Sequence, residues 1–148
     1  MSTTTTIFKR PVTLRWSDID ANFHLRHSVF YDLGAAQRTD LLASLGIGMR
    51  DMQQGGYGPV LFREECRFLR EIRIEDDIEV ETSIAHLSRD FRKFGFEQRF
   101  MRGEEVCAIL RVEGAWFDAR ARKVAPPPTV VIEAIQHVAH TQDFTWLD

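Results

Sequence analysis

Two carboxylates and a histidine stand close together in residues 16–28, between a predicted strand and a predicted helix. The carboxylates are Asp18 and Asp20, and His24 follows Asp20 in the same segment. A helix start offers backbone N–H groups without partners inside the helix and carries partial positive charge. A carboxylate beside it can act as a general base or a nucleophile. We therefore predict a chemical site where this loop meets the helix.

A structural role explains the same residues and stays open. Aspartates often accept hydrogen bonds from loop N–H groups, and on the residue pattern alone that role is the more frequent one. His24 can orient a carboxylate or touch a substrate, and it can equally well serve only to hold the loop. Arg26 can meet an acidic acyl group or a phosphate, but arginine is most often exposed to solvent.

The elements that must position this loop follow from the apolar periodicity. Alternation predicts a first strand over residues 12–16. Ser28 as a helix cap and Gly46 as a left-handed end predict a helix between them. Gly34 inside that helix is tolerable if the helix lies tight against a sheet. The helix carries one apolar stripe, interrupted by Gln37, whose members are Phe30, Leu33, Leu41 and Leu45.

Residues 46–59 are rich in glycine and predict a loop with a short helix near residues 50–53. Beyond this loop, apolar residues recur at every second position in four segments, and turn residues separate them. Short turns imply antiparallel neighbours. Pro126, Pro127 and Pro128 end the last strand. We predict a single α+β domain over residues 1–148, with its core at about 12–127 and a C-terminal helical extension at about 129–148.

Two strand faces carry unusual residues. One face of the first strand after the glycine-rich loop is apolar except for Glu64, and its apolar members are Val60, Phe62, Cys66 and Phe68. A buried Glu64 would be a second catalytic carboxylate with a raised pKa, while an edge position or an arginine partner explains it more simply. On the last strand, Cys107 and Ile109 are apolar opposite Leu110, which suggests a sheet covered on both faces and association between copies.

Composition sets the remaining bounds. The chain has 148 residues, is 44% hydrophobic and 28% charged, and has a formal net charge of -3, which predicts a globular domain and argues against nucleic acid as the main partner. The polar residues 1–6 lack the apolar run of a signal peptide, and no stretch is long enough to span a membrane. The two cysteines are expected to be reduced thiols in a cytoplasmic protein. Neither they nor His137 and His140 have metal-site spacing, so no metal is expected.

The loop and the order of the elements resemble the hotdog-fold acyl-CoA thioesterases of the 4-hydroxybenzoyl-CoA thioesterase type. The loop of that family commonly reads aromatic-x-D-x-D-x-x-G-H-x-N-N-x-x-Y. Here residues 16–30 read W-S-D-I-D-A-N-F-H-L-R-H-S-V-F. Residues 66–71, followed by Asp76 and Asp77, are similar to the second strand of the family and the turn after it. The resemblance spans roughly residues 12–127.

The resemblance implies a fold, an activity and an assembly. The fold is a five-stranded antiparallel sheet wrapped around one long helix. The activity is hydrolysis of an acyl-CoA or, less commonly, of an acyl-carrier-protein thioester, without a metal or other cofactor. Asp20 matches the catalytic carboxylate of the family, as base or nucleophile, and N–H groups near residues 26–29 would stabilise the oxyanion. A homodimer, or a dimer of dimers, would hold the site at its interface.

The resemblance also nominates binding residues. Those at the helix start are Arg26, His27 and Ser28. The basic turn Arg89, Arg92 and Lys93 is a candidate for the CoA phosphates, although a solvated charged turn explains it more simply. Residues that can shape an acyl pocket, or serve as ordinary core, are Tyr31, Met49, Met52 and Tyr57.

Two departures from the family pattern keep a second function open. Phe23 stands where the family usually has glycine, so backbone freedom or a close approach to substrate would be lost. Arg26 and His27 stand where Asn-Asn is common, so helix capping and substrate hydrogen bonding must differ. These departures favour a non-catalytic acyl-thioester binding module on the same fold. A purely structural role of a dimer surface is the other alternative; a hotdog dehydratase would need a histidine motif that is not evident.

Overall fold

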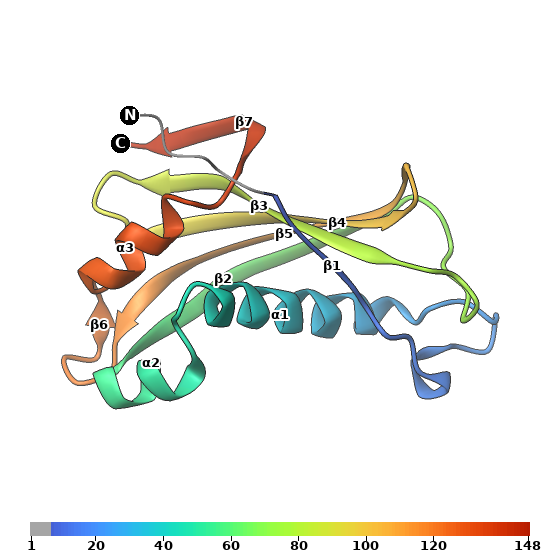
Figure 1. Ribbon diagram of the computed structural model, residues 1–148, viewed down its shortest axis with the longest axis horizontal. Helices are drawn as coiled ribbons and strands as arrows, with labels where there is room; N and C mark the ends of the chain where they lie inside the picture. Colours follow the sequence, from blue (N-terminus) through green and yellow to red (C-terminus); the bar gives the residue numbers. More distant parts are fainter. Residues whose placement is uncertain (1–6) are drawn as a thin grey trace.

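The computed structural model describes residues 7–148, in which one long helix lies along a curved sheet (Figure 1). The prediction for the polar start falls on residues 1–6, which lie outside the described residues. The strands are β1 (Phe8–Pro11), β2 (Tyr57–Phe68), β3 (Glu79–Ser88), β4 (Lys93–Arg102), β5 (Glu105–Asp118), β6 (Lys123–Val124) and β7 (His140–Leu147). The helices are the 3-10 helix η1 (Trp16–Asp18), α1 (His27–Ser44), α2 (Met49–Gly55) and α3 (Thr129–Ile135).

The main sheet has the order β1-β3-β4-β5-β2, with antiparallel neighbours throughout. This arrangement confirms the predicted five-stranded antiparallel sheet around one helix. Two shorter strands extend it. β6 pairs with β5, and β7 pairs in parallel with β3 along the part of its edge that β1 leaves free. β2 forms the opposite edge of the sheet, and no strand among residues 7–148 covers it.

The apolar stripe of α1 packs on the sheet as predicted. Phe30 and Leu41 are buried, and Leu33 and Leu45 pack against the same core. At Gly34 the helix comes so close to β4 and β5 that a Cβ atom would lie 2.9 Å from Oε1 of Gln98. The predicted tight approach at this glycine is therefore confirmed. Gly46 takes the left-handed conformation with φ +85°, also as predicted for the residue after the helix.

The predicted first strand is displaced. Residues 12–15 are irregular, Trp16 begins η1 with its side chain exposed, and the strand lies earlier, at Phe8–Pro11. The cause lies in Asp18, whose Oδ2 accepts the backbone N–H of Arg15 at 3.0 Å. This local hydrogen bond stabilises a tight turn and competes with continued strand pairing.

The predicted apolar face of β2 is correct only in its second half. A bulge between Leu61 and Arg63 shifts the register against β5 and leaves Phe62 unpaired and 63% exposed. Beyond the bulge, Glu64 and Cys66 pair with core-facing residues of β5. Before it, Leu61 faces the helix side in place of Val60. An extra residue in one strand reverses the alternation, and sequence periodicity gives no sign of it.

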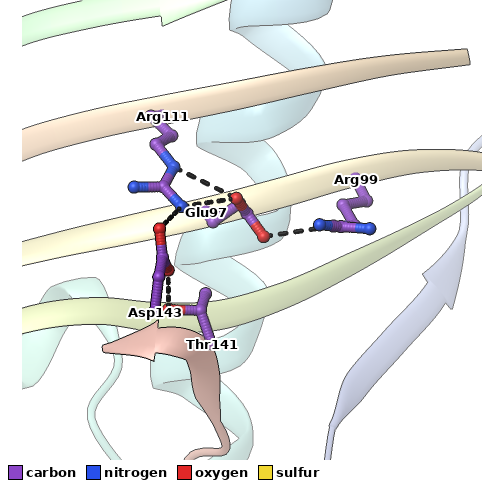
Figure 2. A network of polar contacts seen from close by, with 5 residues as sticks. All are labelled: Glu97, Arg99, Arg111, Thr141 and Asp143. Atoms are coloured by element: carbon purple, nitrogen blue, oxygen red, sulfur yellow. Dashed lines mark hydrogen bonds and ion pairs between the residues drawn. The ribbon is translucent and has the colours of Figure 1, made fainter. Parts of the chain in front are cut away.

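The C-terminal extension is helical only in its first part, so the prediction of a helical extension at about 129–148 is wrong for its second part. α3 ends at Ile135 and β7 follows, because the free edge of β3 offers hydrogen bonds to an extended strand. A polar network fixes this strand to the face of the sheet opposite α1 (Figure 2). Arg111 donates to Glu97 and to Asp143 at 2.8 Å each, and Arg99 donates to the other oxygen of Glu97 at 3.1 Å.

The second face of the sheet is thus covered partly by β7 and by arginine side chains, and its apolar character is confined to a small area. Ile109 is half-buried there, whereas the fully buried Cys107 belongs to the main hydrophobic core. Both cysteines are free thiols, as predicted. Among residues 7–148, no helix combines the length and the apolar character needed to cross a bilayer.

Candidate active site

The loop between η1 and α1 is built around the side chain of Asp20. Its Oδ1 accepts the backbone N–H of Asn22 at 2.8 Å and that of His24 at 3.2 Å. The backbone N–H of Asp20 donates to the carbonyl of His24 at 2.9 Å, which closes the loop from the other side. No partner is recorded for Oδ2 among residues 7–148. Oδ1 of Asp20 therefore stabilises the loop, and Oδ2 is free to accept a proton or a hydrogen bond.

Phe23 keeps the backbone conformation of the glycine that the family pattern has at this position. Its φ is +65°, in the left-handed region, and its ring is 74% exposed. A residue with a Cβ atom adopts this region at a cost of roughly 1–2 kcal/mol. The turn is therefore kept despite the side chain, with strain, and the expected effect on the approach of a substrate stays a prediction.

The start of α1 leaves backbone donors unused. Arg26 precedes the helix, and its N–H donates to the carbonyl of Asp18 at 2.8 Å. The N–H groups of His27 and Ser28 are the first two of the helix, and no acceptor is recorded for either among residues 7–148. Such a pair of free donors suits a developing oxyanion.

Ser28 does not cap the helix as predicted, because the helix already begins at His27. Its Oγ instead accepts a hydrogen bond from Nε of Arg26 at 2.9 Å, and Nη1 of Arg26 donates to the carbonyl of Ser17 at 2.9 Å. The guanidinium therefore links Ser17, before the loop, to the first turn of α1 through hydrogen bonds. Of its three nitrogens, Nη2 is the one without a recorded partner in the described chain.

A hollow of about 300 Å³ brings three of the predicted site residues together at the helix start, while Arg26 and Ser28 are not part of its lining. Its polar members include Asp20, His24 and His27, and Phe30 and Phe68 form part of its apolar wall. The loop is fixed to the far wall by a hydrogen bond of 2.7 Å from the N–H of Leu25 to the carbonyl of Ile72. Asp20 and His27, the first residue of α1, thus line one space.

Glu71 is a member of this hollow to which the sequence alone assigns no role. A hydrogen bond from its own backbone N–H holds the pKa of Glu71 below its usual value, and the charge of His24 acts in the same direction. A second carboxylate therefore lies near His24. Its position, just after β2, is a weak signal, since charged residues are common in such connections.

The basic turn is not part of this hollow. Arg89, Arg92 and Lys93 lie at the β3–β4 turn, at the other end of the sheet from the loop before α1 (Figure 1). The guanidinium of Arg89 lies 4.6 Å from the ring centre of Trp146, and Nε of Arg92 pairs with Asp90 at 2.7 Å. Their predicted contact with CoA stays a prediction, and within one chain they are remote from Asp20.

The other candidates are scattered. Glu64 is exposed on β2 and does not line the hollow that contains Asp20, so it is not the buried acid considered above. Met49 is exposed at the start of α2. Tyr57 is half-buried at the start of β2, where burial raises the pKa of its phenol. Met52 lines a separate hollow beside the second half of α1.

Comparison with known proteins agrees with this architecture. The fold is the hotdog fold, a curled antiparallel sheet around a long helix. Residues 14–135 match the family model of the thioesterase-like superfamily. Because this match covers most of the chain, the protein belongs to that superfamily. No curated protein has a sequence that matches the chain.

Solved structures share the fold at low sequence identity. The 1,4-dihydroxy-2-naphthoyl-CoA thioesterase Slr0204 from Synechocystis is 17% identical, with a TM-score of 0.78, over 88% of this chain and 96% of that one. The protein SAV2348 from Staphylococcus aureus, solved in complex with CoA, is 14% identical, with a TM-score of 0.81, over 100% and 94%. The gentisyl-coenzyme A thioesterase BH1999 is 22% identical, with a TM-score of 0.74, over 88% and 99%.

Proposed function

We propose that this protein hydrolyses acyl-CoA thioesters in the hollow that contains Asp20 and the start of α1. One observation carries the proposal: Asp20, with one carboxylate oxygen free, lines the same hollow as His27, the first residue of α1, whose N–H has no acceptor among residues 7–148. Membership of the thioesterase-like superfamily supports it. So do neighbours of the same fold that are named as CoA thioesterases or bind CoA.

The chemistry needs a polarised carbonyl and an attacking oxygen. The thioester oxygen would accept hydrogen bonds from the N–H groups of His27 and Ser28. Oδ2 of Asp20 would take a proton from water as the water oxygen attacks the carbonyl carbon. The tetrahedral intermediate then collapses, the C–S bond breaks, and the CoA thiolate leaves and is protonated. The products are a free acid and CoA.

A nucleophilic route uses the same residues. Oδ2 of Asp20 would attack the carbonyl carbon directly, the C–S bond would break, and a mixed anhydride would form. Water would then hydrolyse the anhydride and regenerate the carboxylate. His24 would orient the carboxylate or the substrate in either route, and Arg26 would position the helix start through its bonds to Ser17 and Ser28.

The free edge of the sheet supports a proposal for the assembly. β2 has 12 residues and no neighbour on its outer side among residues 7–148, and Phe62 and Phe68 are exposed along it. An unpaired strand of this length is a template for another strand. We propose that two copies pair through β2 into a homodimer, alone or within a dimer of dimers. Light scattering of the purified protein measures this directly.

A non-catalytic binding module is the second candidate. Phe23 presents an exposed ring at the position that is usually glycine. Two of the three guanidinium nitrogens of Arg26 already donate hydrogen bonds, to Ser28 and to Ser17. Such a protein would bind acyl-CoA through the same hollow and release no CoA. Turnover therefore separates the two candidates.

The test measures CoA release from short, long and aromatic acyl-CoAs by the wild type, by Asp20→Asn and by Asp40→Asn. Asp40 is an exposed aspartate of α1 outside the hollow and serves as the matched control. We expect Asp20→Asn to lose about 100-fold or more in kcat, as is typical for removal of a positioned base. Turnover that survives in Asp20→Asn would reject this carboxylate. CoA esters that bind without turnover would favour the binding module.

A further inference from the structure

Arg38 is a half-buried arginine without an acidic partner in contact. It lies in the second half of α1, and no ion pair is recorded for it among residues 7–148. Its Nη1 donates to Oε1 of Gln98 at 2.8 Å. Burial lowers the pKa of Arg38 from its usual value, and the charge of Glu64 opposes this change. Arginine stays charged in proteins, so a cation with unused donors is held inside the fold.

The position of Arg38 is fixed by its neighbour. Gln98 is fully buried on β4, and its Nε2 donates to the carbonyl of Gly34 at 2.9 Å and to Oγ1 of Thr82 at 3.1 Å. The amide therefore cannot turn to a different partner without leaving two bonds unmade. One edge of the guanidinium is thereby tied to a rigid network, while its remaining N–H groups are available.

A hollow of about 150 Å³ lies beside Arg38, between α1, α2 and the sheet. Its wall is largely apolar and includes Leu42, Met52, Pro59, Leu61, Phe96 and Trp116. Trp116 is 2% exposed, and its Nε1 has no hydrogen-bond partner. The hollow is of the size that holds a benzene ring. Arg38 supplies charged donors to this hollow, and no acidic residue among residues 7–148 lines it.

We propose that this hollow binds the far end of an acyl group that terminates in a carboxylate, with Arg38 as the residue that selects it. The inference rests on the proposed thioester hydrolysis. A guanidinium offers two parallel N–H groups that match the two oxygens of a carboxylate. The apolar wall takes the methylene groups of the chain.

The second copy places this hollow beside the thioester. In one chain, Arg38 stands eleven residues after His27 on α1, which is about 16 Å along the helix. The hollow lies at the Tyr57 end of β2, and the hollow containing Asp20 lies at the Phe68 end. Antiparallel pairing of two β2 strands sets these opposite ends side by side. Arg38 of one copy would then bind the terminal carboxylate of the acyl group whose thioester is hydrolysed at Asp20 of the other copy.

The first test compares esters matched in length. The wild type and Arg38→Met are assayed with adipoyl-CoA beside hexanoyl-CoA, and Arg50→Met, on the exposed surface of α2, serves as the control. We expect the wild type to prefer adipoyl-CoA in kcat/KM, and Arg38→Met to lower that preference by about 10- to 100-fold, the range of a charge-assisted hydrogen bond. Arg38→Lys keeps the positive charge but lacks the two parallel N–H groups of a guanidinium, so it should lose less of the preference for adipoyl-CoA than Arg38→Met does. Circular dichroism checks that each variant is folded.

The second test asks which copy supplies the arginine. A mixed dimer is prepared from one Asp20→Asn copy and one Arg38→Met copy that carry different tags. If Arg38 acts across the dimer, one of the two sites has both residues intact, and the mixed dimer keeps about half of the activity with the full preference for adipoyl-CoA. If Arg38 acts within its own chain, the remaining activity has no preference.

The outcomes separate this inference from the proposed function. Hydrolysis of both esters at equal kcat/KM by the wild type, or an unchanged preference in Arg38→Met, would overturn the inference and leave the thioesterase in place. A preference for hexanoyl-CoA or for aromatic esters over adipoyl-CoA would do the same. No turnover of any ester would overturn the proposed function, and this inference with it.

Discussion

The carboxylate of Asp18, which is 1% exposed, accepts hydrogen bonds from the backbone N–H of Arg15 at 3.0 Å and from its guanidinium at 2.9 Å. The carbonyl of Asp18 accepts the N–H of Arg26 at 2.8 Å. This aspartate therefore connects the start of the loop to the residue that precedes α1. In the proposed mechanism it supports the position of Asp20 and is not assigned a part in the chemistry itself.

Replacement of Asp18 should weaken the fold at neutral pH and matter little in acid. The hydrogen bond from Arg15 holds the pKa of Asp18 below its usual 3.8, despite its burial. Because the folded state depresses this pKa, the stabilisation is present above the unfolded value and disappears as pH falls through the folded one. We expect Asp18→Asn to cost roughly 1–3 kcal/mol at pH 7.

Urea unfolding at several pH values measures this effect. The difference between wild type and Asp18→Asn should shrink below about pH 4. The exposed Asp77→Asn is the control and should show no such difference. A difference that is constant down to strongly acidic pH would contradict the role given to the Arg15 contact.

Phe23→Gly should stabilise the protein. Phe23 has φ +65°, and its exposed ring makes little packing that would be lost. Release of left-handed strain exceeds the added chain entropy of glycine, so we expect a gain of about 0.5–1 kcal/mol. Phe91 is the matched control, because it has the same φ but packs 5.9 Å from Trp146 between ring centres. Phe91→Gly should therefore gain less or lose stability; a loss in Phe23→Gly itself would show that the turn is not strained.

Gly34→Ala should destabilise the protein although alanine favours helix. The new Cβ would collide with Cδ2 of Leu110 and lie 2.9 Å from Oε1 of Gln98. Overpacking of this kind costs about 1–3 kcal/mol, against a helix-propensity gain of about 1 kcal/mol. Thermal unfolding checks the sign. Ala36→Gly, on the exposed side of α1, is the control: it should lower Tm through lost helix propensity alone, so alanine is the more stable residue at position 36 and glycine at position 34. An increase in Tm for Gly34→Ala would contradict the close approach of helix and sheet.

The thiol of Cys66 should be unreactive in the folded protein. Burial raises its pKa to about 11, and burial also raises the pKa of the fully buried Cys107. Since the thiolate is the nucleophile, iodoacetamide at about pH 8 should modify neither residue until the chain is unfolded. Mass spectrometry of the native and denatured protein reports the modification. Fast labelling of Cys66 in the native state would show that this strand is more open than described.

The sequence predicted the long helix and the antiparallel strands because their apolar periods are strong. It also predicted the tight contact at Gly34, since an interior glycine needs a packing reason. It failed at β1, where the hydrogen bond between Asp18 and Arg15 overrides strand alternation. It failed again in β2, where the bulge at Phe62 reverses the face of each residue before it.

The site was predictable to a lesser degree. The loop motif pointed to Asp20, and the structure places Asp20, His24 and His27 around one hollow. The roles proposed for Glu71 and Arg38 depend on contacts between segments that are distant in the sequence. The spacing of residues along the chain does not predict such contacts. The β7 strand was missed because its partner is the edge of β3, more than 50 residues earlier in the chain.

The most direct measurement removes a single backbone donor at the helix start. Proline suits the first position of a helix, and Arg26 before it already has φ -65° and ψ 136°, as a residue before proline requires. His27→Pro therefore deletes the N–H, while His27→Ala deletes the side chain and keeps the N–H. We predict that kcat for CoA release is about 100-fold lower in His27→Pro than in His27→Ala, as for loss of an oxyanion donor. Equal kcat values in two folded variants would contradict the account.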